Sequence, residues 1–213
     1  MTEPDVTLTD YGLAVECALF ACLLERPGAR RGPLRAWFVL FFGSAGLAAL
    51  AGGTVHGFFL DPATAGARVL WPLTLLASGA TALAAWAIGA RIQFAEAAAR
   101  RIEIAAALEF SAYAAIVVLG DQAFAVAVLN YLPAALFLLV VFGLAYRRTG
   151  ERPILIGTLG LGATFVASAV QQAGVSLHPV YVNHNALYHL IEAGALFLLF
   201  QGARHFVGAM ARE

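Results

Sequence analysis

Long apolar stretches alternate with short polar connections along the whole chain. A helix needs about 20 mostly apolar residues to cross the hydrocarbon core of a bilayer. Seven stretches approach or reach that length, and the connections are too short to hold a second domain. The pattern predicts an all-α integral membrane protein, a seven-transmembrane-helix bundle forming one domain over residues 1–213. The expected helices are Tyr11–Leu24 (with Thr7–Asp10 as an optional extension), Ala36–Leu60, Val69–Ile92, Ile102–Leu119, Ala123–Tyr146, Ile154–Gln172 and Asn185–Phe206.

The composition agrees with a membrane protein and excludes several other classes. Hydrophobic residues make up 61% of the chain and charged residues 12%, whereas a soluble domain is about half apolar and a quarter charged. Thirteen basic residues balance thirteen acidic ones, so no net field attracts nucleic acid. The chain has no Lys, which excludes Schiff-base or P-loop lysine chemistry. Cys17 and Cys22 are five apart on one helix and point in different directions, so we expect no disulfide between them.

The arginines indicate how the bundle is oriented. Under a seven-helix model every arginine except Arg68 lies on one side of the membrane, and the positive side faces the cytoplasm. We therefore expect the N-terminus outside and the C-terminus in the cytoplasm. The absence of Lys and the abundance of Ala and Gly favour a bacterial inner membrane. The arginines on the expected cytoplasmic side are Arg26, Arg30, Arg31, Arg35, Arg91, Arg100, Arg101, Arg147, Arg148, Arg152, Arg204 and Arg212.

Polar side chains inside the expected helices gather in the outer half of the bilayer. Intramembrane polar groups are costly and often functional, so we predict a polar pocket that faces the periplasm. Each group could instead pair with one neighbour and only fix the packing, at an average of about 0.6 kcal/mol. That alternative is strongest for Asn130 and Gln171 taken singly. The pocket set comprises Glu16, Thr54, His56, Glu109, Asn130, Gln171, Asn185, His189 and Glu192.

The start of the seventh helix has the densest polar pattern. Asn185, His189 and Glu192 are spaced three and four apart and share one helix face. His184 is five residues from His189 and lies about 140° away if both are helical. Alternatively, His184 lies in a turn next to an asparagine that caps the helix. His56 is expected at a similar depth on the second helix, so a metal site built on His56 and His189 is one interpretation.

These features resemble a known family. The helix count, the outside N-terminus, His56 late in the second helix and the Asn-Ala-Leu-Tyr-His-Leu run at 185–190 resemble the intramembrane hydrolases that include alkaline ceramidases, adiponectin-type receptors and haemolysin-III-like proteins. The resemblance implies a zinc held by His56 and His189, with a zinc-bound water attacking an amide in a lipid. The neighbouring His184 is a further candidate metal ligand. Asn185 stands where that family has the first histidine of its helix-seven pair, and Gly52 stands in place of its serine.

Three functions follow as expectations. The first is a zinc-dependent, ceramidase-like hydrolase of a membrane lipid or amphiphile, with Glu192, Glu16 and Thr54 as candidate catalytic residues. The second is a redox protein with haem between His56 and His189. The third is a non-catalytic ligand-binding or assembly protein, either as a homo-oligomer or with another membrane protein. The inner half lacks a polar path to the cytoplasm, which disfavours a channel or carrier.

Overall fold

A computed structural model describes residues 1–25, 32–178 and 180–209. This part of the chain forms seven α-helices, and an isolated β-bridge joins His178 and Val182. The predicted all-α, seven-helix class is confirmed, and all seven helices are long and apolar enough to span a membrane. The helices are α1 (Pro4–Leu24), α2 (Pro33–Phe58), α3 (Ala65–Gln93), α4 (Glu96–Leu119), α5 (Phe124–Thr149), α6 (Arg152–Gln172) and α7 (His184–Ala209).

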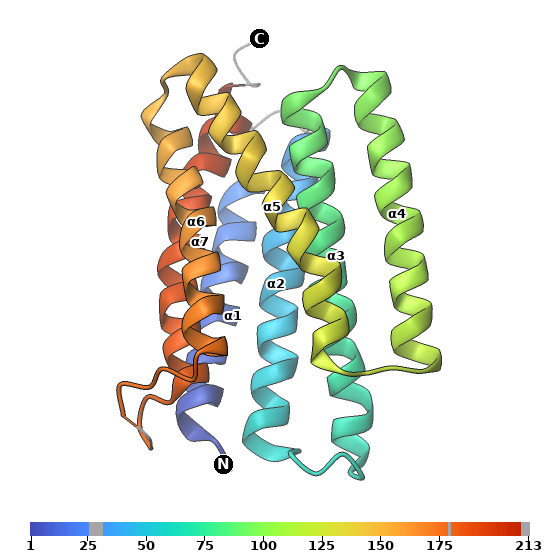
Figure 1. The fold of residues 1–213 in the computed structure, drawn as a ribbon, viewed down its shortest axis with the longest axis vertical. Coiled ribbons are helices and arrows are strands. Elements are labelled where there is room, and N and C mark those ends of the chain that lie inside the picture. Colours follow the sequence, from blue (N-terminus) through green and yellow to red (C-terminus); the bar gives the residue numbers. More distant parts are fainter. Residues whose placement is uncertain (26–31, 179, 210–213) are drawn as a thin grey trace.

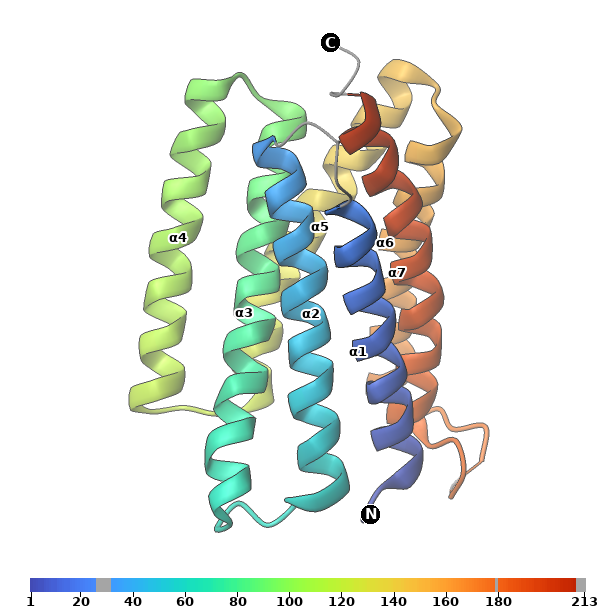
Figure 2. The ribbon, with the colours of Figure 1, turned by 180° about the vertical axis from the view of Figure 1, so that it is seen from behind.

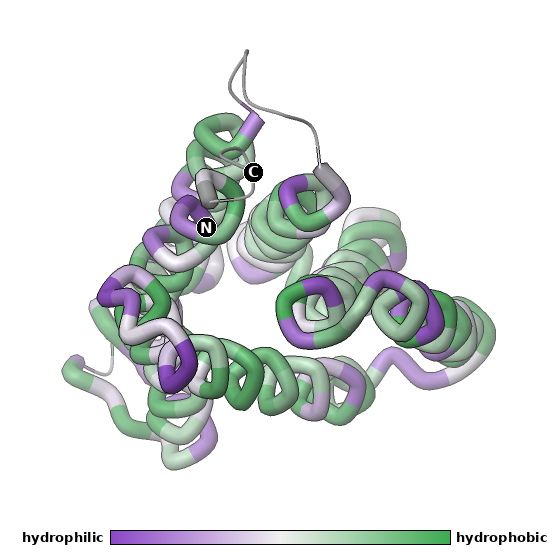
Figure 3. The backbone as a smooth tube through the Cα atoms, turned by 90° about the horizontal axis from the view of Figure 1, so that it is seen from above, coloured by the Kyte–Doolittle hydropathy of each residue, from purple (hydrophilic) through white to green (hydrophobic). Residues whose placement is uncertain are grey.

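Six helices form a closed ring, and the seventh lies outside it. Each helix of the ring packs against the next in the order α1, α2, α3, α5, α6, α7, and α7 returns to pack against α1 (Figures 1 and 3). The α4 helix packs on the outer side of α3 (Figure 2). The first and the last helix of the chain are therefore neighbours, although they lie far apart in sequence.

Glycine allows the closest helix contacts in this ring. A Cβ atom placed on Gly53 of α2 would lie 2.6 Å from the Cβ of Asp10 on α1. A Cβ placed on Gly160 of α6 would lie 2.6 Å from the carbonyl oxygen of Ala195 on α7. Small residues at helix interfaces let backbones approach closely in membranes. The Gly53 contact brings α1 against α2 at the level of Asp10.

The first helix begins earlier than the apolar pattern predicts. The expected start at Tyr11 is wrong, because α1 begins at Pro4 and so includes the optional extension Thr7–Asp10. The hydroxyls of Thr7 and Thr9 bond the main-chain oxygens of Glu3 and Asp5 one turn earlier, so these polar residues are accommodated within a helix. Asp10 is thereby placed inside the bundle with an exposed fraction of 5%. The other helix boundaries lie within six residues of the expected ones, and three of them, Leu24, Leu119 and Gln172, coincide with the expectation.

The two ends of the bundle differ in charge. The start of α1 lies at one end, called here the N-terminal end, and α7 finishes at the other (Figure 1). The described arginines lie at the ends of helices that meet at this second end, the arginine end, except for Arg68 near the start of α3. Arg26, Arg30, Arg31 and Arg212 lie outside the described residues.

The half of the bundle toward the arginine end has an apolar, aromatic interior. Phe20 of α1 stacks on Phe200 of α7 with ring centroids 4.3 Å apart, and Phe42 of α2 meets both rings edge-on. Phe42 is fully buried. We call these three rings the aromatic layer. Cys17 is buried, Cys22 is exposed, and both are free, as expected from their spacing.

A candidate binding site between the first and last helices

The α1 and α7 helices run parallel from the N-terminal end, and polar residues face each other across their contact. Three levels follow one another along the pair, and together we call them the polar ladder. At the first level, the main-chain N–H of Asn183 donates to the carboxylate of Asp5, 3.1 Å away. The Asn183 side chain accepts from the main-chain N–H groups of Asn185 and Ala186. Asn183 is therefore the cap of α7, and His184 is the first helical residue and not part of a turn.

The second level joins Thr9, Asp10 and His189. Nδ1 of His189 lies 3.1 Å from the Thr9 hydroxyl, and Nε2 lies 3.2 Å from the Asp10 carboxylate. The side chains of His189 and Asp10 are 11% and 8% exposed. The Thr9 oxygen also lies 2.9 Å from the main-chain oxygens of Asp5 and Val6, which only accept. The hydroxyl therefore has one proton to share between two main-chain acceptors, and whether it donates to His189 Nδ1 or accepts from it depends on the tautomer of the ring.

The third level consists of two partly buried carboxyl groups. Glu16 of α1 lies within electrostatic range of Glu192 of α7. One oxygen of each, Oε2, is buried without a hydrogen-bond partner among the described residues. Tyr131 of α5 and Tyr188 of α7 lie within the electrostatic range of Glu192. A buried polar atom without a hydrogen-bond partner is costly. A ligand that donates to these two oxygens would remove that cost, so the third level is the best candidate for a binding site.

A second polar contact links α1 to α2 at the N-terminal end. Nδ1 of His56 lies 2.5 Å from the Glu3 carboxylate. The Thr54 hydroxyl lies 3.1 Å from that of Tyr11 and donates to the main-chain oxygen of Leu50. Both sequence-predicted residues of α2 thus have partners in α1 or in the residue that precedes it.

The remaining predicted pocket residues divide into two groups. Asn185 accepts a hydrogen bond from the amide nitrogen of Gln171 on α6 across 3.0 Å, in the manner of a packing contact. The Asn130 amide nitrogen is buried and has no hydrogen-bond partner within the described part of the chain. Glu109 lies on an exposed face of α4, outside the helix ring, and the structure does not bring it to the polar ladder.

The three histidines of the predicted zinc site do not form a ligand set. A His ligand must offer a free ring nitrogen to the metal. Both nitrogens of His189 face partners, Thr9 and Asp10, and Nδ1 of His56 faces Glu3. Among the described residues, which include His184, no group of three or more His, Cys, Asp or Glu side chains is arranged to hold a metal ion. The residues in this conformation therefore do not fit zinc, and the same contacts of His189 oppose an axial haem bond.

Sequence reasoning missed several residues of the ladder. The apolar pattern places Thr9 and Asp10 only in the optional extension of the first helix, and it places Asp5 before that helix. Asp10 lies six residues before Glu16 and seven before Cys17, so it shares the inward face of α1 with the buried Cys17. In a helix that begins at Pro4, this spacing predicts that Asp10 points into the bundle.

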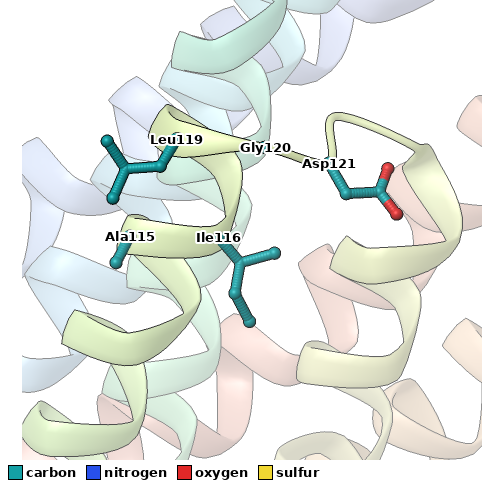
Figure 4. Close-up of a pocket in the computed structure, with 5 residues that line it drawn as sticks. All are labelled: Ala115, Ile116, Leu119, Gly120 and Asp121. Atoms are coloured by element: carbon teal, nitrogen blue, oxygen red, sulfur yellow. The ribbon is translucent and has the colours of Figure 1, made fainter.

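Two surface depressions in the described part of the chain lie away from the ladder. One is an open hollow at the end of α4, lined by Ala115, Ile116, Leu119, Gly120 and Asp121 (Figure 4). The Asp121 carboxylate accepts from the main-chain N–H of Ala123 and so completes the turn into α5. A second hollow lies between α2 and α3. Both are lined mainly by apolar atoms, as expected for surfaces covered by lipid.

Comparison with known proteins assigns the chain to a family. A family model described as a family of unknown function (DUF6962) matches residues 6–207, so the chain belongs to that family. No curated protein and no solved structure matches the chain. The matched region includes parts of all seven helices and both sides of the polar ladder.

Proposed function

We propose that this protein is a non-catalytic binding protein of a bacterial inner membrane, and that the polar ladder binds a small cation from the periplasmic side. The observation that carries the proposal is the pair of partly buried carboxyl groups of Glu16 and Glu192, each with one buried oxygen that lacks a partner among the described residues. Carboxylate oxygens are ligands for hard cations and are strong hydrogen-bond acceptors for ammonium groups.

The charge balance of the ladder supports a cationic ligand. The ladder contains four carboxyl groups and one imidazole, and among the described residues the only arginine in the N-terminal half of the bundle is Arg68 near the start of α3. A buried charge without a counter-charge is expensive. A cation between the two deepest carboxyl groups would supply that counter-charge. The carboxyl groups are those of Asp5, Asp10, Glu16 and Glu192, and the imidazole is that of His189.

The polar ladder reaches only part of the way through the membrane, which supports binding of a cation and not its transport across the bilayer. From Asp5 to Glu16 the chain rises about 16 Å along α1, roughly half of a 30 Å hydrocarbon core. One turn further along α1, Phe20 enters the aromatic layer. A path for ions needs polar groups along its whole length. A cation that reached Glu16 would therefore return to the side from which it entered, which by the arginine pattern is the periplasm.

The proposal is tested by cation binding to the purified protein in detergent. Ethylammonium, Na⁺ and Mg²⁺ are titrated while thermal unfolding is followed. A cation present at 100 times its Kd raises the free energy of unfolding by about 2.7 kcal/mol. We expect saturable stabilisation by at least one of the three and at least a tenfold weaker affinity in Glu16→Gln and in Glu192→Gln.

The matched control is Glu151→Gln, which makes the same change in an exposed turn between α5 and α6. This variant is expected to bind like the parent protein. The proposal is wrong if none of the three cations stabilises the parent, or if the two ladder variants bind as tightly as the control.

A hydrolase remains a second candidate because of the second level of the ladder. Thr9, His189 and Asp10 have the order of a nucleophile, a base and an orienting acid, as in hydrolytic triads. In such a step the Thr9 oxygen bonds the carbonyl carbon of an ester while His189 accepts the hydroxyl proton. The leaving alcohol then takes that proton, and water later releases the acyl group.

Acyl transfer is tested with p-nitrophenyl acetate and intact-protein mass spectrometry. The hydrolase candidate requires an acetyl adduct that is lost in Thr9→Val and retained in Thr54→Val, whose hydroxyl is also on a helix at the N-terminal end. Zinc analysis of the same samples separates this candidate from the metal-dependent hydrolase. About one zinc per chain, lost in His189→Ala with the fold intact, would favour the metal enzyme.

A further inference from the structure

Glu109 is placed where a carboxyl group should not face lipid. It lies near the middle of α4 (Glu96–Leu119), and its side chain is exposed. It forms no hydrogen bond or ion pair with any other residue that the structure describes. Acidic residues within membrane spans almost always face the protein interior or a water-filled cavity, or pair with another polar group. The position of Glu109 therefore indicates that another polypeptide covers it.

The packing of α4 agrees with a missing neighbour. In the described part of the chain α4 packs substantially only on α3. Only 17% of its most apolar window is buried, against 67% for α3 and at least 33% for every other helix. Lipid accounts for exposed apolar side chains such as Leu108. It does not account for the carboxyl group among them.

We propose that the face of α4 around Glu109 binds the same face of a second copy of this chain. Two copies inserted in the same orientation are related by a two-fold axis along the membrane normal. That symmetry puts the two Glu109 side chains at the same depth. A protonated carboxyl group both donates and accepts a hydrogen bond, so the two groups satisfy one another without any other partner.

The residues beside Glu109 allow two α4 helices to approach. Ala105 is four residues before it and Ala112 three residues after it, so both share its helix face. Both are exposed. Small residues on the contacting face let two membrane helices come close enough for interhelical hydrogen bonds. The same face therefore combines a polar group that needs a partner with the small residues that admit one.

The test is the oligomeric state of the full chain in lipid vesicles, measured by energy transfer between labelled copies at increasing protein-to-lipid ratio. We expect reversible dimers in the parent and at least tenfold weaker association in Glu109→Leu and Ala112→Leu. Ala107→Leu is the matched control. Ala107 is exposed on the same helix but points about 160° away from Glu109, so this variant is expected to associate like the parent.

Cross-linking gives a second measurement that does not depend on stability. In a chain without its native cysteines, Ala112→Cys is expected to form disulfide-linked dimers in membranes, and Ala107→Cys is not. Energy transfer absent at all ratios overturns the proposal. So does equal weakening by Ala107→Leu and Ala112→Leu, or cross-linking of Ala112→Cys to a different membrane protein in place of a second copy.

Discussion

Replacing Gly53 with alanine is a direct test of how closely α1 and α2 pack beside the ladder. The new Cβ would lie 2.6 Å from the Cβ of Asp10 and 3.3 Å from the Tyr11 ring. Carbon atoms are best separated by about 3.5–4.0 Å, so the overlap with Asp10 is about 1 Å. Relieving such overlap by shifting a packed helix costs about 1–3 kcal/mol.

Gly43→Ala provides the reference for this change. Gly43 is in the same helix, and a Cβ placed there meets nothing within 4 Å. Both substitutions gain the same helix propensity, about 1 kcal/mol, so the difference between the variants isolates the steric cost. We expect Gly53→Ala to be about 1–3 kcal/mol less stable than Gly43→Ala.

The assay is equilibrium unfolding of both variants in mixed micelles, with increasing SDS and tryptophan fluorescence as the signal. A second readout follows from the position of Asp10. If α1 moves away from α2, the contact between Asp10 and His189 changes, and cation binding weakens in Gly53→Ala but not in Gly43→Ala. Equal stability of the two variants would refute the close contact and the geometry of the second level with it.

Three further results are expected. Gly160→Ala should destabilise by at least as much as Gly53→Ala in the same assay, because its Cβ would meet backbone atoms of α7 at 2.6–2.7 Å; a neutral result would contradict the α6–α7 packing. A double-mutant cycle of Ser44→Ala and Thr81→Val should give a coupling energy of about 0.6 kcal/mol, since their hydroxyls lie 2.8 Å apart; a coupling energy of zero would contradict that hydrogen bond. In a chain without its native cysteines, a membrane-impermeant maleimide added to whole spheroplasts should label Asp121→Cys but not Arg148→Cys, and the reverse pattern would invert the expected orientation.

The fold was predictable because a bilayer imposes a simple length requirement on each helix. Seven apolar stretches predict seven helices. The start of α1 was not predictable by the same rule, because Asp5 and Asp10 interrupt its apolar character. In the structure these acids are tolerated because α7 supplies Asn183 and His189 opposite them. Sequence patterns within one helix carry no information about such a partner.

The depth of the candidate residues was easier to predict than the direction in which they point. Glu16 and Glu192 are expected in one layer and lie within electrostatic range of each other. His56 and His189 also lie within electrostatic range of each other, but each ring contacts an acid in or just before α1 and not the other histidine. Glu109 has the expected mid-helix position, yet α4 lies outside the ring. The rotation of a helix and its place in a bundle depend on its neighbours, and spacing within the helix does not reveal them.

The contact between α1 and α7 has a consequence for the biosynthesis of the protein. The ribosome makes the α1 side of the polar ladder before the α7 side, with five other helices in between. An acidic residue at the centre of a membrane helix costs about 2.5–3.5 kcal/mol on insertion. Until α7 emerges, Asp10 and Glu16 have no partners on that helix. The nascent α1 must therefore wait in the insertion machinery or beside α2, and a chain truncated before α7 should be a substrate for membrane quality-control proteases.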